Sequence, residues 1–137
     1  MTMRCAKCGN DTDVGPGGMC PACMTLAGDP RRRIGHPRYY ELMEKAMAIH
    51  AAKNSDYATG SDPLSNFREC EKAGVTAEDG CYTRLSDKWC RVQNLLRKER
   101  TGGSPAVDES IEDTLLDAVN YCAILIVLRE ERKAKKS

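Results

Sequence analysis

Residues 109–128 read ESIEDTLLDAVNYCAILIVL, and this stretch predicts a long, partly buried helix. At about 100° per residue, four of its polar side chains fall within an arc of about 80°: Glu109, Asp113, Asp117 and Asn120. From residue 122 to 128 the chain is apolar on every side, which indicates burial or a subunit contact. We expect Asp108 or Ser110 to cap this helix and the helix to end near residue 131.

Three further segments show helical patterns. Residues 37–54 carry apolar residues at helical spacing after a proline that can start a helix. A short helix is expected at about 66–72. Thr76, followed by an acidic first turn, opens a helix to about residue 98, although Gly80 costs that helix up to about 1 kcal/mol and leaves open a later start. Because no alternating strand pattern occurs outside the first 28 residues, the sequence predicts an all-α helical bundle.

The first part of the chain has a different composition, rich in glycine and cysteine. We therefore divide the chain into a zinc-ribbon module (1–28), a linker (29–36) and an all-α nucleotide-binding domain (37–137). The linker contains the basic run Arg31–Arg33, which we interpret as a solvated tether.

Two Cys-x-x-Cys pairs lie in the first module. A two-residue gap lets both thiolates of a pair bind one metal, and Gly9 permits a tight turn after the second thiolate. We predict a closed, structural zinc site with four ligands: Cys5, Cys8, Cys20 and Cys23. An iron centre or a redox dithiol is the alternative. The module either docks on a neighbouring domain or contacts nucleic acid or protein.

The overall composition excludes some functions. Lys and Arg (21) nearly balance Asp and Glu (20), so no net charge attracts the whole chain to nucleic acid or to a membrane. One Trp, one Phe and five Tyr are too few for a stacking platform for single-stranded bases. Without an apolar N-terminal signal or a membrane-spanning run, we expect a cytoplasmic protein with no membrane partner.

The acidic side of the last helix suggests a metal site. Asp113 and Asp117 lie one turn apart, and two carboxylates about 6 Å apart repel by roughly 3 kcal/mol at an effective dielectric near 20. A magnesium ion held by these two carboxylates and by substrate phosphates would remove this repulsion. The alternative is an acidic first turn stabilised by the helix dipole, with Asp117 paired to a nearby arginine.

The preceding helix carries a complementary set of charges. Arg84, Asp87, Lys88 and Arg91 fall within an arc of about 100°, an arrangement that suits a polyphosphate. The alternative is a set of ion pairs on an exposed face. The functional interpretation requires this cationic stripe and the acidic start of the last helix to face each other across a single cleft.

The segment after the first long helix is rich in charged and amide side chains. Lys53 and Arg68 could contact phosphate, and Tyr57 or Phe67 could pack on a base. A structural role is equally open for each of them, and Asn66 in particular can cap the short helix. His50 is isolated in the sequence, so we predict a structural role for it.

Four ordered motifs within residues 38–130 resemble the nucleotide modification associated domain, type 1, a family common in phages. The motifs are KNxDY at 53–57, DPLSNFR at 62–68, RLSDKW at 84–89 and DESIEDTLLDxxNY at 108–121. That family in turn is similar to the MazG-like, all-α nucleoside triphosphate pyrophosphatases, which hold magnesium with acidic residues of two neighbouring helices. MazG-like enzymes carry Glu-x-x-Glu and Glu-x-x-Asp, whereas the corresponding positions here are Arg84-x-x-Asp87 and Asp113-x-x-x-Asp117.

The resemblance implies a homo-oligomeric bundle, a dimer or tetramer, located in the host cytoplasm if a phage encodes the chain. It also implies magnesium-dependent pyrophosphohydrolysis of a (deoxy)nucleoside triphosphate, in phage nucleotide-pool or base-modification metabolism. The predicted catalytic residues are Asp87, Glu112, Asp113 and Asp117. The predicted substrate-binding residues are Lys53, Asn54, Asp56, Asn66, Arg68, Arg84, Lys88, Arg91 and Asn120. The alternative function is a non-catalytic adaptor whose zinc ribbon binds nucleic acid or protein.

Overall fold

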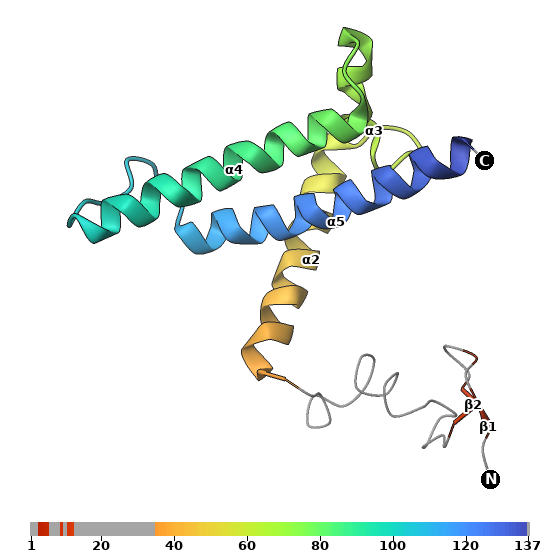
Figure 1. Cartoon of the computed structure of the whole chain (residues 1–137), viewed down its shortest axis with the longest axis horizontal. Coiled ribbons are helices and arrows are strands. Elements are labelled where there is room, and N and C mark those ends of the chain that lie inside the picture. The colour runs from red at the N-terminus through yellow and green to blue at the C-terminus, as the bar shows by residue number, and fades with distance from the viewer. Residues whose placement is uncertain (1–2, 6–8, 10, 13–34, 137) are drawn as a thin grey trace. The chain divides into compact units, whose positions relative to one another are not determined.

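The computed structural model describes residues 3–5, 9, 11–12 and 35–136, which divide between two compact units, 1–41 and 42–137. The elements are strands β1 (Met3–Arg4) and β2 (Asp11–Thr12), α-helices α2 (Pro37–Tyr57), α3 (Ser65–Arg68), α4 (Ala77–Arg100) and α5 (Ile111–Lys136), and the 3₁₀ helix η2 (Glu69–Ala73) (Figure 1). The described chain is thus mostly helical, as predicted. Within it, every helix is either too short or too polar to cross a lipid bilayer.

The described part of the first unit contains a two-stranded antiparallel pairing. Met3 lies opposite Thr12, and Arg4 lies opposite Asp11. Between the strands, the backbone N–H of Gly9 donates a hydrogen bond of 2.9 Å to the carbonyl of Cys5, and Gly9 has a φ of 75°. The predicted tight turn at Gly9 is therefore present, because glycine adopts positive φ without steric cost.

Cys5 is buried, with 2% of its surface exposed. The other three predicted zinc ligands, Cys8, Cys20 and Cys23, lie outside the described residues, as does most of the predicted linker. The zinc site therefore stays a prediction.

The second unit is built on α4 and α5, which lie side by side and run in opposite directions (Figure 1). One apolar cluster fills the end near α3, and it contains Leu64, Phe67, Ala77, Cys81, Ile124 and Leu128. A smaller cluster of Val92, Leu95 and Ile111 lies near the 101–110 loop. Between the two clusters, Lys88 and Arg91 of α4 contact Asp117 and Thr114 of α5, and these contacts form part of the site described below.

The start of α4 is explained by a cap. Thr76 accepts a hydrogen bond of 3.1 Å from the backbone N–H of Asp79, so Thr76 is the N-cap and the helix begins at Ala77. The later start that the sequence left open is therefore wrong. Gly80 lies near the start of α4, where the helix packs so closely on η2 that a side chain has no room. A Cβ at this position would lie 2.6 Å from Sγ of Cys70.

We expect Gly80→Ala to lower the free energy of unfolding by about 1 kcal/mol. Overpacking against Cys70 costs about 1–3 kcal/mol, while alanine gains about 1 kcal/mol of helix propensity. In a Cys70→Ala background the clash is gone, and the same substitution should instead stabilise by about 1 kcal/mol. Urea unfolding of the four chains measures both values. An equal effect of Gly80→Ala in both backgrounds would show that Cys70 is not the obstacle.

Candidate functional site

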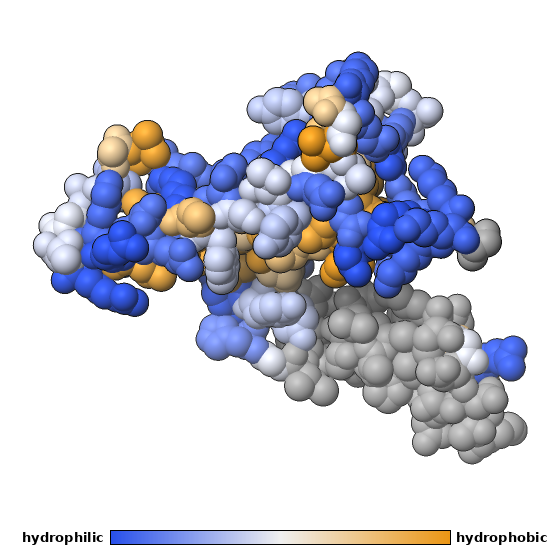
Figure 2. Space-filling view, turned by 45° about the horizontal axis from the view of Figure 1, so that its top comes forward, coloured by the Kyte–Doolittle hydropathy of each residue, from blue (hydrophilic) through white to orange (hydrophobic). Residues whose placement is uncertain are grey.

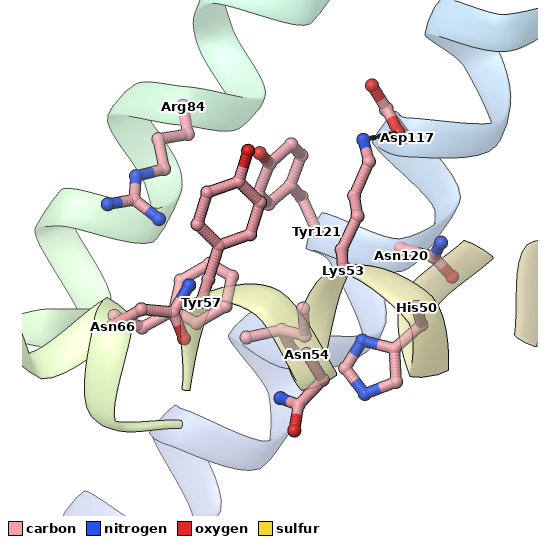
Figure 3. A pocket seen from close by; sticks show the side chains of 11 residues that line it. His50, Lys53, Asn54, Tyr57, Asn66, Arg84, Asp117, Asn120 and Tyr121 are labelled. Carbon is pink, nitrogen blue, oxygen red and sulfur yellow. Dashed lines mark hydrogen bonds and ion pairs between the residues drawn. The ribbon is translucent and has the colours of Figure 1, made fainter. Parts of the chain in front are cut away.

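A cavity of about 320 Å³ opens within the second unit between α2, α3, α4 and α5 (Figure 3). Its lining residues are His50, Lys53, Asn54 and Tyr57 of α2, Asn66 and Phe67 of α3, Arg84 of α4, and Asp117, Asn120, Tyr121 and Ile124 of α5. The volume falls in the range of small-molecule sites. Amides, cations and aromatic rings from distant parts of the sequence therefore share one space.

Helix α2 forms one wall of the cavity because its lining residues recur every three or four positions. Two polar contacts fix this wall to the rest of the unit. Asn120 donates a hydrogen bond of 2.9 Å from Nδ2 to the carbonyl of Ala46, and Asn54 donates one from Nδ2 to the carbonyl of Pro63. Both amides thus position α2 as well as line the cavity.

The 62–68 motif forms a turn that orients α3. Asp62 accepts hydrogen bonds from the backbone N–H of Leu64 (3.0 Å) and from Nε of Arg68 (2.7 Å). Arg68 also donates from Nη2 to Glu131 of α5, at 2.6 Å. The hydrogen bond to Arg68 holds the pKa of Asp62 below its ordinary value, and the same bond raises the pKa of Arg68. Arg68 therefore anchors the motif and does not line the cavity.

Asp117 is the acidic residue of the cavity, and it is buried, with 7% of its surface exposed. Lys53 donates a hydrogen bond of 2.7 Å to its Oδ1, and the ammonium of Lys88 lies 3.0 Å from its Oδ2. Burial acts to raise the pKa of Asp117, but the hydrogen bonds from the two lysines outweigh burial and hold the pKa below its ordinary value. Asp117 is therefore an ionised carboxylate between two ammonium groups.

Lys88 and Arg91 of α4 do face the start of α5, but they meet it through ion pairs and hydrogen bonds within the protein and not across a cleft. Lys88 lies 3.8 Å from Glu109 as well as close to Asp117. Arg91 donates to the hydroxyl of the fully buried Thr114 and, at 2.8 Å, to the carbonyl of Glu109. Burial lowers the pKa of Lys88, yet its ion pairs raise the value above the ordinary one. Lys88 and Arg91 thus join α4 to α5 and do not line the cavity.

The four predicted catalytic carboxylates are not brought together. Asp117 alone among them lines the cavity. Asp113 is exposed, accepts a hydrogen bond of 2.8 Å from the Ser110 hydroxyl, and lies 4.0 Å from Lys45. The Ser110 contacts lower the pKa of Asp113. Asp87 lines a separate hollow beside Arg91, and Glu112 is exposed.

This arrangement does not fit a magnesium ion held mainly by the protein. Among residues 35–136 and the few described before them, no three His, Cys, Asp or Glu side chains are grouped as metal ligands. Both oxygens of Asp117 already contact lysines. The negative charge that seemed to need a metal is thus neutralised by Lys53 and Lys88, and magnesium stays a prediction from the sequence.

Five of the predicted substrate-binding residues do line the cavity: Lys53, Asn54, Asn66, Arg84 and Asn120. The other four, Asp56, Arg68, Lys88 and Arg91, do not. His50 and Tyr121 also line the cavity, although they were not among the predicted site residues. His50 could have been found from its spacing, because it lies one helical turn before Lys53 and Asn54 on the same face of α2.

Arg84 and Asn66 are the cavity residues with unused polar groups. The guanidinium of Arg84 lies 4.9 Å from the centre of the Phe67 ring, and it forms no ion pair within the described part of the chain. Oδ1 of Asn66 is buried and has no hydrogen-bond partner among the described residues. A buried acceptor without a partner costs about 1–3 kcal/mol, so a ligand that donates to Asn66 would recover this cost.

Comparisons with protein-family models, with curated proteins and with solved structures found no match for this chain.

Proposed function

We propose that the cavity binds a (deoxy)nucleoside triphosphate, as the substrate of a nucleoside triphosphate pyrophosphohydrolase. The observation that carries the proposal is the position of Arg84. It provides a cation at the cavity without a carboxylate partner among the described residues, whereas Lys53 and Lys88 both contact Asp117. An arginine in this position can bind two phosphate oxygens at once through its planar guanidinium.

The remaining lining suits the nucleoside part of such a ligand. Tyr57 and Tyr121 line the same cavity as Arg84 and Asn66 (Figure 3). Aromatic rings stack on bases, and amide side chains such as that of Asn66 form hydrogen bonds with base edges. A phosphate group at Arg84 would therefore leave the base among the rings and the amides.

Asp117 would act by positioning lysines. Its lowered pKa makes it a weak base at neutral pH, so it is poorly suited to take a proton from an attacking water. Instead it holds the ammonium of Lys53 at the cavity, where that charge can also stabilise phosphate oxygens. Cleavage to monophosphate and pyrophosphate is the reaction that the sequence motifs imply.

The test is calorimetric titration of the full chain with canonical and base-modified dNTPs, with and without magnesium, followed by measurement of pyrophosphate release. We expect Arg84→Met to weaken binding by about 10- to 100-fold, because a hydrogen bond to a charged group contributes about 1.5–3 kcal/mol. Arg97→Met, which removes an exposed cation of the same helix outside the cavity, is the matched control and should bind as the unchanged chain does.

Two results would contradict the proposal. One is that the unchanged chain binds none of the nucleotides at millimolar concentration in either condition. The other is that Arg84→Met binds as tightly as Arg97→Met. Binding without pyrophosphate release would keep the nucleotide site and reject the hydrolase.

A further inference from the structure

Helix α5 carries an apolar stripe that the described residues leave partly exposed. Leu115, Val119, Cys122 and Ile126 follow one another at intervals of four, three and four residues, the spacing of a coiled-coil seam. Leu115 and Val119 are each 38% exposed, and Ile126 is 57% exposed. Large aliphatic side chains in such a row are typical of a helix that packs against a partner.

The stripe faces away from the cavity. On α5, Cys122 lies about 200° around the helix axis from Asn120, which contacts α2. On α4, the exposed Trp89 and Leu96 lie about 120–140° from Arg84, which lines the cavity. Both helices therefore expose apolar side chains on the side opposite the candidate site. Hydrophobic side chains do remain at the surface of this unit between hydrophilic ones (Figure 2).

The charges of α5 indicate what would cover this stripe. Its first turn contains Glu112 and Asp113, and its last turn contains Lys133, Lys135 and Lys136. Neither Glu112 nor Lys133 forms an ion pair within the described part of the chain. A second α5 in the opposite direction would place basic residues beside each acidic end, and a parallel one would place like charges together.

The apolar side chains fit the same arrangement. With a twofold axis between Val119 and Cys122, each Leu115 lies opposite Ile126 of the second copy, and each Val119 lies opposite Cys122. A C2 interface must be self-complementary in this way. The 26 residues of α5 span about 39 Å, and two helices about 10 Å wide present a face on the order of 800 Å², the area per partner of a standard interface.

We propose that a second copy of this chain packs on the α4–α5 face, with the two α5 helices antiparallel about a twofold axis between Val119 and Cys122. Each dimer would keep two separate cavities on its outer sides. The proposal does not depend on the ligand of the cavity.

Sedimentation equilibrium of the full chain tests the proposal, and Ile126→Lys is the decisive variant. We expect a dimer at tens of micromolar for the unchanged chain, and a dissociation constant raised by about 100-fold or more for Ile126→Lys, because two lysines per dimer would be placed in an apolar contact. Val127→Lys is the matched control: Val127 is also exposed, at 42%, but lies about 100° from Ile126. It should remain dimeric. Circular dichroism checks that both variants keep their helices.

Trp89, the single tryptophan, provides a second measurement. Its emission should shift to the red when the protein is diluted below the dissociation constant, because its indole passes from the interface to water. The charge reversal Glu112→Lys should weaken the dimer several-fold, because in this register Glu112 lies opposite the basic Arg129 of the second copy. A monomeric unchanged chain, or equal dimerisation of Ile126→Lys and Val127→Lys, would overturn the proposal. An unchanged dimer in Glu112→Lys would overturn the antiparallel arrangement, because only a parallel one would place Glu112 opposite itself.

Discussion

Asp117→Ala should lower the free energy of unfolding by about 3 kcal/mol. Removing one partner of a buried ion pair costs about 3–5 kcal/mol, because the remaining charge is left without a partner. The Asp117 side chain is 10% exposed and that of Lys88 is 25% exposed, whereas that of Lys53 is 51% exposed and can turn to water. The cost should therefore lie at the low end of this range.

Urea unfolding measures this cost, and a double variant identifies its cause. In Asp117→Leu with Lys88→Met, the buried charges are replaced by apolar groups of similar size, which often restores stability. We expect the double variant to lose less than the sum of the two single variants. A loss below 1 kcal/mol for Asp117→Ala would show that the ion pair contributes little.

The same pairing determines how stability depends on pH. Because the pKa of Asp117 is lower in the folded protein than its ordinary value of 3.8, its contribution is fully present above about pH 4 and is lost as the pH falls through the folded value. The pKa of Lys88 is raised above its ordinary value of 10.5, so its contribution is present below that pH and lost above it. Asp117→Asn should flatten the acid side of the stability profile.

Phe67→Ala should cost about 3–4 kcal/mol, as is typical for a phenylalanine removed from a core. Phe67 is 7% exposed, packs with Leu64 and Ile124, and meets the Tyr121 ring edge-on with 6.0 Å between ring centres. Its ring also lies under the guanidinium of Arg84. The substitution removes core packing and one wall of the cavity together.

Thermal and urea unfolding measure the effect of Phe67→Ala, and Phe67→Leu, which keeps most of the apolar volume, is the graded control at about 1–2 kcal/mol. Val75→Ala removes methyl groups from an exposed residue of the same unit and should cost less than about 0.5 kcal/mol. Equal losses for Phe67→Ala and Val75→Ala would show that Phe67 does not hold the core together.

Much of the helical structure could be predicted because it follows from local rules. Pro37 starts α2, Thr76 caps α4, and Gly9 makes its turn, each through an interaction with neighbours in the chain. The start of α4 was less certain from sequence because Gly80 disfavours a helix by itself. A glycine is needed at position 80 because Cys70, which belongs to another element, lies too close for a side chain there.

The site was harder to predict because helical periodicity gives the side of a helix on which a residue lies, and not what that side meets. Asp117 was correctly expected to need a neutralising partner. The partners are lysines, and Lys53 lies 64 residues away in the sequence, so local patterns could not reveal it. In the same way, Asp87 lies on the α4 arc that contains Arg84, yet it lines a different hollow.

The hairpin of α4 and α5 also bears on the order in which the protein folds. The two helices are neighbours in sequence, joined by residues 101–110, so their contacts close a short stretch of chain and should form early. The α2 segment after residue 41 buries only Ala46 and is tied to α5 by Lys53 and Asn120. Detachment of this segment would therefore be a low-energy local opening, which exposes the cavity while the hairpin stays folded.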